Sequence, residues 1–467
     1  MNRRAPNIVV LIADDHRYES LGCNGNSEVE TPNLDGLARR GVSFDGAHCQ
    51  GGMHPAVCVP SRASFLTGRN IFASAVDPTG DDYEASAFAI PAALETFPQR
   101  LRAQGYVTHA IGKWHNDKEA FARSFSSGDR LMFGGMSDHD RVPLRHHDPK
   151  GQYPEAGIYY EDGLSTDLFR DSALDFLRNR SPDQPYCLYV AFTAPHDPRT
   201  PPDAFGRTGD TVSLPANFLP IHPFDNGEML VRDELLEAFP RPAAAVRQHI
   251  ADYYGMIAHL DAAVGDILRA LKDNGDDANT IVVYTADHGL ALGQHGLMGK
   301  QNLYEHSLHI PLIIAGPGLP WGKRLPHLVW HADTSATLLE LAGCPVDPLA
   351  EGHSLVPIMS GTDADWRETF AAAYRFSQRM IRDSHYKLIR YIDQAPLARG
   401  PYRVDNTPSR GSRTEQLFDL VADPGETVNL AALPAYAAHR ERLARMLDAW
   451  QRSVGDPLLA AEEQAAR

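Results

Sequence analysis

The sequence contains few cysteines and no long apolar or basic segment. Its 467 residues include five cysteines, an odd and sparse set that gives no disulfide framework. No apolar run approaches the roughly 20 residues that span a bilayer. The net charge is −16, from 60 acidic and 44 basic residues, and no Lys/Arg-rich run is present. We therefore expect neither a nucleic-acid nor a membrane partner. The sequence carries no signal of an oligomeric state.

The N-terminus also lacks the features of an export signal. The apolar segment Ile8–Ala13 is short for a signal peptide and ends in Asp14 and Asp15, with no small-residue cleavage site behind it. We interpret this segment as the first strand of the fold and expect a cytoplasmic protein.

The composition is that of an ordinary globular protein, with 43% apolar and 22% charged residues. Continuous runs rich in Val, Ile and Tyr alternate with helical patterns, which is typical of parallel strands covered by helices on both faces. The pattern predicts an α/β fold, with a large, mostly parallel central sheet sandwiched by helices. The predicted strands are Ile8–Ala13, Val107–Ile111, Cys187–Phe192, Ile281–Thr285 and Ile310–Ala315, and the predicted helices include one that begins at Pro32 and one over about 243–273.

The pattern changes after about residue 360. Short strand-like pieces at 369–376, 378–382, 386–391 and 416–420 precede a helical segment at about 436–452. We expect a smaller antiparallel sheet with a covering helix. The predicted division is a main α/β domain, residues 1–360, and a C-terminal subdomain, residues 361–467. Two long segments, 128–159 and 200–242, are interpreted as loops, which often form binding sites.

One segment, Cys58–Arg69, is the most informative in the chain. Its sequence is CVPSRASFLTGR. Pro60 suits the first turn of a helix and Gly68 its end. Cys58 is then expected just ahead of a helix N-terminus, where backbone N–H groups and the helix dipole favour an anion and activate a thiol. A lone cysteine is more often a small core residue, so the rest of the chain must decide between these interpretations.

Chemically active side chains follow four of the predicted strands. Ligands bind at the carboxyl ends of the strands in an open parallel sheet. The residues at these ends are Asp14 and Asp15, Lys113 and His115, His196, and Asp287 and His288. Any one of them alone would more often be structural, but the coincidence across four strands predicts an active site at this edge.

Three of these residues, Asp14, Asp15 and Asp287, are hard oxygen ligands. Clustered carboxylates without a cation raise one another's pKa values, and a divalent cation relieves that repulsion. Oxygen-rich sites favour Ca²⁺ or Mg²⁺ over Zn²⁺, and Mn²⁺ also suits them. His288 adds a nitrogen ligand or contacts the substrate instead.

Together these elements resemble the type I sulfatases of the alkaline phosphatase superfamily. The pattern C-x-P-S-R with its T-G tail resembles the signature in which the cysteine is oxidised to formylglycine, an aldehyde. Pro60 and Arg62 match the residues that the modifying enzyme reads. G-K-W-H at 112–115, P-H-x-P at 195–198 and Lys300 ahead of a Y-E pair match further family elements. The resemblance extends over nearly the whole chain, residues 7–430.

The resemblance implies a metal site and a mechanism. Asp14, Asp15, Asp287 and His288 would hold Ca²⁺ together with the formylglycine made from Cys58. The hydrated aldehyde, stabilised by the cation and Arg62, would attack the sulfur of a sulfate monoester. Lys113, Lys300 and the cation would neutralise the sulfuryl oxygens, and His196 or His115 would protonate the departing alkoxide. The implied partners are a small-molecule or saccharide sulfate ester and a formylglycine-generating enzyme.

Other functions stay open at this point. A phosphonate monoester or phosphodiester hydrolase uses the same formylglycine, and a non-catalytic anion- or glycan-binding relative leaves Cys58 unconverted. A zinc phosphatase of the superfamily normally has Ser or Thr as nucleophile and more His ligands, so Cys58 speaks against it. A basic cluster in the first long loop is either a solvated face or a saccharide site, and it slightly favours a sulfated carbohydrate as substrate. Its members are Arg141, Arg145, His146, His147 and Lys150.

Overall fold

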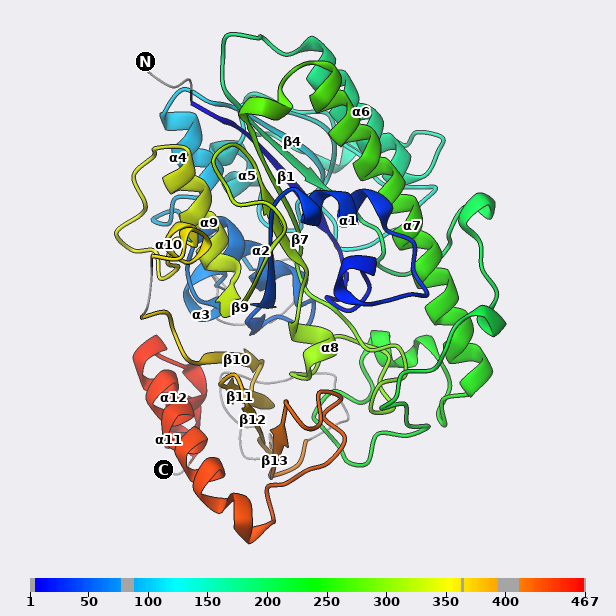
Figure 1. Cartoon of the computed structure of the whole chain (residues 1–467), viewed down its shortest axis with the longest axis vertical. Coiled ribbons are helices and arrows are strands. Elements are labelled where there is room, and N and C mark those ends of the chain that lie inside the picture. Colours follow the sequence, from blue (N-terminus) through cyan, green and yellow to red (C-terminus); the bar gives the residue numbers. More distant parts are fainter. Residues whose placement is uncertain (1–4, 77–87, 363–364, 394–410, 466–467) are drawn as a thin grey trace.

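The computed structural model describes residues 5–76, 88–362, 365–393 and 411–465, which form two β-sheets with associated helices (Figure 1). Within these residues no helix is both long and apolar enough to cross a membrane. The larger sheet has eight strands in the order β5-β4-β6-β1-β7-β8-β2-β9. Their bounds are β1 (Asn7–Ala13), β2 (Val42–His48), β4 (Val107–Lys113), β5 (Ser127–Met132), β6 (Tyr186–Ala191), β7 (Thr280–Ala286), β8 (Leu312–Ala315) and β9 (Lys323–Trp330).

The centre of this sheet is parallel and fully buried. Every residue of β1, β6 and β7 is buried, which explains their continuous apolar sequences. The register places Gly112, Ala191, Ile12 and Thr285 in one row across four neighbouring strands. The residues that follow these strands therefore emerge at one edge of the sheet.

Two groups of helices cover the two faces of the sheet (Figure 1). The 31-residue helix α7 packs against α1 and α6 on one side, and α2, α4 and α9 pack together on the other. The bounds are α1 (Pro32–Arg39), α2 (Cys58–Thr67), α3 (Ile71–Ser74), α4 (Phe97–Ala103), α5 (Lys118–Ser124), α6 (Ser165–Asn179), α7 (Ala243–Asp273), α8 (Glu305–Leu308), α9 (His331–Leu341) and α10 (Val356–Ser360). The predicted α/β sandwich is confirmed.

The smaller sheet has the order β13-β12-β11-β10-β3 and is antiparallel except for its last pair. The helix α11 covers one face with Leu443 and Leu447. The two-residue strand β3 comes from the N-terminal part of the chain and pairs in parallel with β10, so Gly52 lies opposite Tyr374. The bounds are β3 (Gly51–Gly52), β10 (Phe370–Tyr374), β11 (Gln378–Arg382), β12 (Tyr386–Tyr391), β13 (Thr414–Asp419), α11 (Ala437–Val454) and α12 (Pro457–Ala465).

Several sequence predictions are wrong in detail. The strand expected at Ile310–Ala315 begins at Leu312 and runs antiparallel to both β7 and β2. The segment 128–159 is not wholly a loop, because it starts within the edge strand β5, whose first four residues are only partly buried. Such a strand lacks the continuous apolar run by which β1 is recognised. The segment 200–242 contains only short 3-10 turns.

Candidate active site

The helix α2 begins with Cys58 itself, and Val57 is its N-cap. The sequence placed Cys58 just ahead of the helix, so the helix starts one residue earlier than expected, and Pro60 lies within its first turn. Gly68 ends the helix with a φ of 70°, as its sequence position predicts. All ten residues of α2 are buried. The cysteine therefore lies at a buried helix N-terminus, directed at the carboxyl edge of the large sheet.

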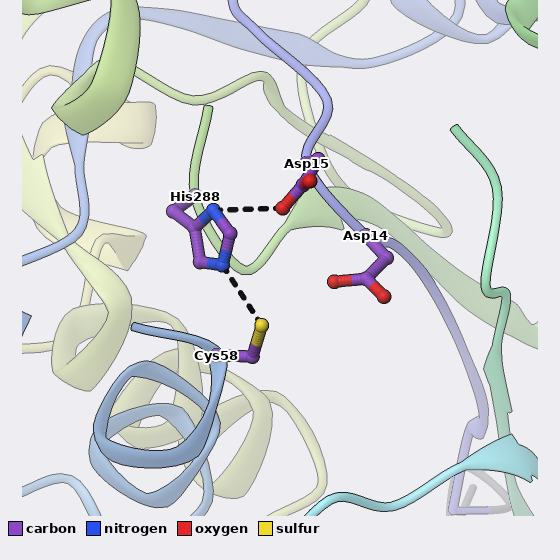
Figure 2. Close-up of side chains that lie close together, drawn as sticks. All are labelled: Asp14, Asp15, Cys58 and His288. Atoms are coloured by element: carbon purple, nitrogen blue, oxygen red, sulfur yellow. Dashed lines mark hydrogen bonds and ion pairs between the residues drawn. The ribbon is translucent and has the colours of Figure 1, made fainter. Parts of the chain in front are cut away.

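Three cationic or basic groups surround the sulfur of Cys58. The Nζ atoms of Lys113 and Lys300 both lie 3.8 Å from its Sγ, and Nε2 of His288 lies 3.1 Å from it. Figure 2 shows the ring of His288 between Cys58 and Asp15. Burial raises the pKa of the Cys58 thiol, but Lys113, Lys300 and His288 outweigh it and bring the pKa to about 7. The environment stabilises negative charge at this position.

The carboxylates of the site are bound by these same cations. Lys113 Nζ pairs with Asp14, and Lys300 Nζ lies 2.8 Å from Asp15 Oδ1. Asp15 has a φ of 67°, a strained conformation for a residue with a side chain. Its backbone N–H donates to Oδ1 of Asp287 at 3.2 Å. The backbone after β1 is thereby fixed against the end of β7.

Arg62 connects the nucleophile helix to the strand ends. Its Nε donates to Asp287 Oδ2 at 2.9 Å, and its Nη1 donates to the backbone carbonyl of Lys113 at 2.8 Å. Its Nη2 is 3.8 Å from Asp14 Oδ1. Arg62 is fully buried, so these contacts are shielded from solvent and lock α2 to β4 and β7.

The donor set fits a divalent cation. Ligand atoms of Asp14, Asp15, Cys58 and His288 all lie within 4.8 Å of one another and are buried. Asp14 Oδ1 has no hydrogen-bond partner among the described residues, and burial followed by repulsion from Asp287 raises the pKa of Asp14 to about 8. A hard cation would satisfy this oxygen and favour its ionised form. Asp287 adjoins the group, with its Oδ1 3.8 Å from His288 Nε2.

The two candidate proton donors differ in their surroundings. Nε2 of His196 lies 3.8 Å from Asp15 Oδ2, and its Nδ1 lies 3.4 Å from Asp197 Oδ1. His115 contacts no carboxylate among the described residues, and burial moves its pKa well below the usual value. The ring of His115 adjoins Gly135, where a Cβ would come within 2.6 Å of it. Two carboxylates thus flank the ring of His196, whereas burial keeps His115 neutral.

A cavity of about 350 Å³ adjoins the site beside Val59 and His115. Phe88 and Phe133 also line it. Of the basic loop cluster, only Arg145 is associated with this cavity, because its guanidinium packs 5.8 Å from the ring of Phe133. The remaining members are exposed or partly exposed: Arg141, His146, His147 and Lys150.

The sequence did not indicate several supporting residues. His331, the first residue of α9, donates through Nε2 to the carbonyl of Ala286, and its Nδ1 lies 3.0 Å from Ser61 Oγ. Gln378 of β11 donates to the carbonyl of Gln301, next to Lys300, at 3.1 Å. A polar residue in a short strand gives no sequence signal of such a role, because the contact arises only when the two sheets pack together.

Comparison with known proteins identifies the family. The sulfatase profile matches residues 6–344, well over half of the chain. The chain belongs to the sulfatase family. A second profile, the N-sulphoglucosamine sulphohydrolase C-terminal region, matches residues 293–453. The family and its relatives make this sulfatase a sulfuric ester hydrolase.

Curated relatives agree with this assignment, and solved structures share the fold. This sulfatase is 27% identical to an N-acetylglucosamine-6-O-sulfatase of Bacteroides thetaiotaomicron, over 97% of its own chain and 87% of the relative. It is 27% identical to an arylsulfatase of Clostridium perfringens, over 95% and 93% of the two chains. A structure described as a complex with its substrate D-glucosamine-2-N,6-O-disulfate superposes with a TM-score of 0.78 at 24% identity, covering 97% and 99%. The phosphonate monoester hydrolase of Agrobacterium radiobacter has a TM-score of 0.73 at 21% identity, covering 96% of both chains.

Proposed function

We propose that this sulfatase hydrolyses the O-sulfate ester of a saccharide, using a formylglycine made from Cys58 and a bound divalent cation, Ca²⁺ above all. The observation that carries this proposal is the environment of the Cys58 sulfur. Two lysines at 3.8 Å, an imidazole at 3.1 Å and a cluster of carboxylates surround that one atom. A structural cysteine needs none of these groups.

The formylglycine hydrate would supply the nucleophilic oxygen, and the cation would stabilise its negative charge. Asp14, Asp15, Asp287 and His288 are the residues that would hold the cation. The protein itself supplies the positive charge around the sulfuryl group. Lys113 and Lys300 are placed to neutralise the negative charge that the sulfuryl oxygens carry, while the charge that grows on the leaving oxygen is taken up by a proton.

Arg62 and His196 have separate roles in this proposal. Arg62 holds Asp287 and the end of β4, and so keeps α2 in register with the metal-binding carboxylates. We assign protonation of the leaving alkoxide to His196, because the carboxylates of Asp15 and Asp197 lie 3.8 Å and 3.4 Å from its two ring nitrogens. His115, kept neutral by burial, is then a hydrogen-bonding partner of the substrate at the wall of the cavity.

The saccharide substrate is supported by two relatives and by the cavity. One curated relative is named for N-acetylglucosamine 6-O-sulfate chemistry, and the structure of similar fold contains a sulfated glucosamine. The cavity beside Val59 has about 350 Å³ and combines two aromatic rings with His115 and Asn116. This mixture of apolar faces and a few polar groups suits a sugar ring.

Conversion of Cys58 is tested by intact-mass analysis after co-expression with a formylglycine-generating enzyme. Replacement of the thiol by an aldehyde lowers the mass by about 18 Da, and the shift should map to the peptide that contains Cys58. An unshifted mass together with sulfatase activity would contradict the proposed nucleophile.

The reaction is tested by comparing a sulfate ester and a phosphonate ester of the same phenol, and then sulfated saccharides against choline sulfate. We expect kcat/KM to favour the sulfate ester and, among sulfates, the saccharide. A preference of several decades for the phosphonate ester would identify the phosphonate hydrolase activity instead.

A further inference from the structure

A hollow of about 390 Å³ lies at the end of the large sheet opposite to the active site. It is bordered by the ends of α1 and α7, the start of β7 and the loop after β8. β7 begins with Thr280 at the hollow and ends with Ala286 beside Asp287. The seven residues of β7, with a rise of about 3.3 Å each, separate the hollow from the active site. No residue assigned to the active site lines the hollow, so its role is independent of the proposed function.

The wall of the hollow is mostly apolar, and it includes an exposed indole ring. The apolar lining residues include Leu37, Leu268, Leu271, Val282, Ala315 and Trp321. Trp321 is 75% exposed, the highest value among the exposed large apolar side chains in the described part of the chain. A protruding aromatic next to an apolar concavity is typical of a protein–protein contact.

The loop that carries Trp321 is built to hold a fixed shape. It joins β8 to β9 with the sequence GPGLPWG, residues 316–322. Gly318 and Gly322 have φ values of 81° and 62°, and two prolines restrict the backbone between β8 and Trp321. A loop that already holds a fixed shape loses little conformational entropy on binding.

Two opposite charges flank the hollow without partners. Arg40, directly after α1, and Asp277, in the turn after α7, both line it and are exposed. Neither side chain forms a hydrogen bond or ion pair with another described residue. The patch thus carries an apolar projection, an apolar recess, a free cation and a free anion.

We propose that this face forms a two-fold symmetric dimer in which Trp321 of each copy enters the hollow of the other. An isologous interface requires each surface to complement itself. Arg40 and Asp277 line the same hollow that would receive the partner's Trp321, so a two-fold axis there can set Arg40 of one copy against Asp277 of the other and pair both charges. A small ligand or an unrelated protein would need to match only the recess or the projection, and only one of the two charges. A second copy of this chain uses all four features, so it is the occupant of this proposal.

The test uses the full chain and its mass in solution over a range of concentrations. We expect wild type to form a particle of twice the chain mass of 51.4 kDa. Trp321→Glu should raise the dimer dissociation constant at least about 100-fold, with unchanged activity per chain. The control Val421→Glu alters another exposed apolar residue, 69% exposed in the turn after β13, and should leave the dimer intact.

Charge reversal gives a second, independent test. Arg40→Asp and Asp277→Arg should each weaken the dimer about tenfold, and the double variant should restore it to within about threefold of wild type. A monomer at every concentration would overturn the proposal. A dimer unaffected by Trp321→Glu, or a double variant no tighter than the single ones, would overturn it equally.

Discussion

Nε2 of His288 lies 3.1 Å from Sγ of Cys58, in direct contact with the atom that is converted in the proposed mechanism. Nδ1 of the same ring lies 3.2 Å from Asp15 Oδ1. One imidazole therefore touches both the nucleophile position and the carboxylate cluster. Substitutions at His288 should therefore affect both Cys58 and Asp15.

Cys58→Ala should lower kcat/KM for a sulfate ester at least about 1,000-fold, because the nucleophile is lost. The side chain is small, so the thermal midpoint should change little. Steady-state kinetics and a thermal melt on the same preparation check both statements. Activity within tenfold of wild type would remove Cys58 from the mechanism.

Lys113→Met and Lys300→Met should each lower kcat about 100- to 1,000-fold, because each removes a cation from the transition-state sulfuryl group. KM should change much less. Lys272→Met, an exposed lysine near the end of α7, is the matched control and should be silent. A raised KM with unchanged kcat would limit the two active-site lysines to ground-state binding.

Metal removal should abolish activity and lower the thermal midpoint, and Ca²⁺ should restore both. Binding at about 100 times the dissociation constant adds about 2.7 kcal/mol to stability. Asp14→Asn should weaken the Ca²⁺-dependent rise, because Asp14 Oδ1 has no hydrogen-bond partner among the described residues. A chelator-treated protein whose melting is insensitive to added Ca²⁺ would contradict a cation site.

Stability should fall as the pH drops from about 6.5 towards 4, because two neighbouring buried imidazoles are held neutral. Burial lowers the pKa of His222 to about 4 and, with the charge of His222, that of His295 to about 3. The unfolded chain binds protons at both positions below about 6.5, whereas the folded chain does not. Each imidazole thus costs up to about 1.4 kcal/mol per pH unit.

Urea unfolding between pH 7.5 and 4.5 measures this effect. His222→Gln should reduce the slope by the contribution of one imidazole. The exposed His353 gives a control, since His353→Gln should leave the slope nearly unchanged. Equal slopes for wild type and His222→Gln would refute the assignment.

Lys387→Met should destabilise the protein by about 3–5 kcal/mol, because the buried carboxylate of Glu426 loses its cationic partner. Lys387 is fully buried, and its Nζ lies 2.9 Å from Glu305 Oε1 and 2.8 Å from Glu426 Oε1. Adding Glu426→Gln should recover part of the loss in chemical unfolding. No recovery in the double variant would show that the ion cluster does not carry the effect.

The sequence was sufficient where a local pattern reports its own environment. β1, β6 and β7 are buried on both faces, so their apolar runs are continuous and their ends locate Asp14, His196 and Asp287 correctly. α7 was predicted with its observed bounds, because its apolar stripe recurs at helical spacing over 31 residues.

The sequence was insufficient where structure depends on distant partners. β9 contains Pro326 and begins with Lys323 and Arg324, so no local rule identifies it as the edge of the sheet. The direction of β8 depends on its neighbours, not on its own four residues. In the same way, the contact of Gln378 with Gln301 becomes visible only after the two sheets are assembled.

The pairing of β3 with β10 has a consequence for the order of events during synthesis. Gly52 precedes Cys58 by six residues, yet its partner Tyr374 lies about 320 residues later. At about 5–20 residues per second, the ribosome needs roughly 15–60 s to reach it. Through that interval the segment ahead of Cys58 lacks its final strand partner, whereas in the finished fold the cysteine is 1% exposed. In the proposed mechanism, a formylglycine-generating enzyme would therefore act on Cys58 within a time window that is set by the length of the intervening chain.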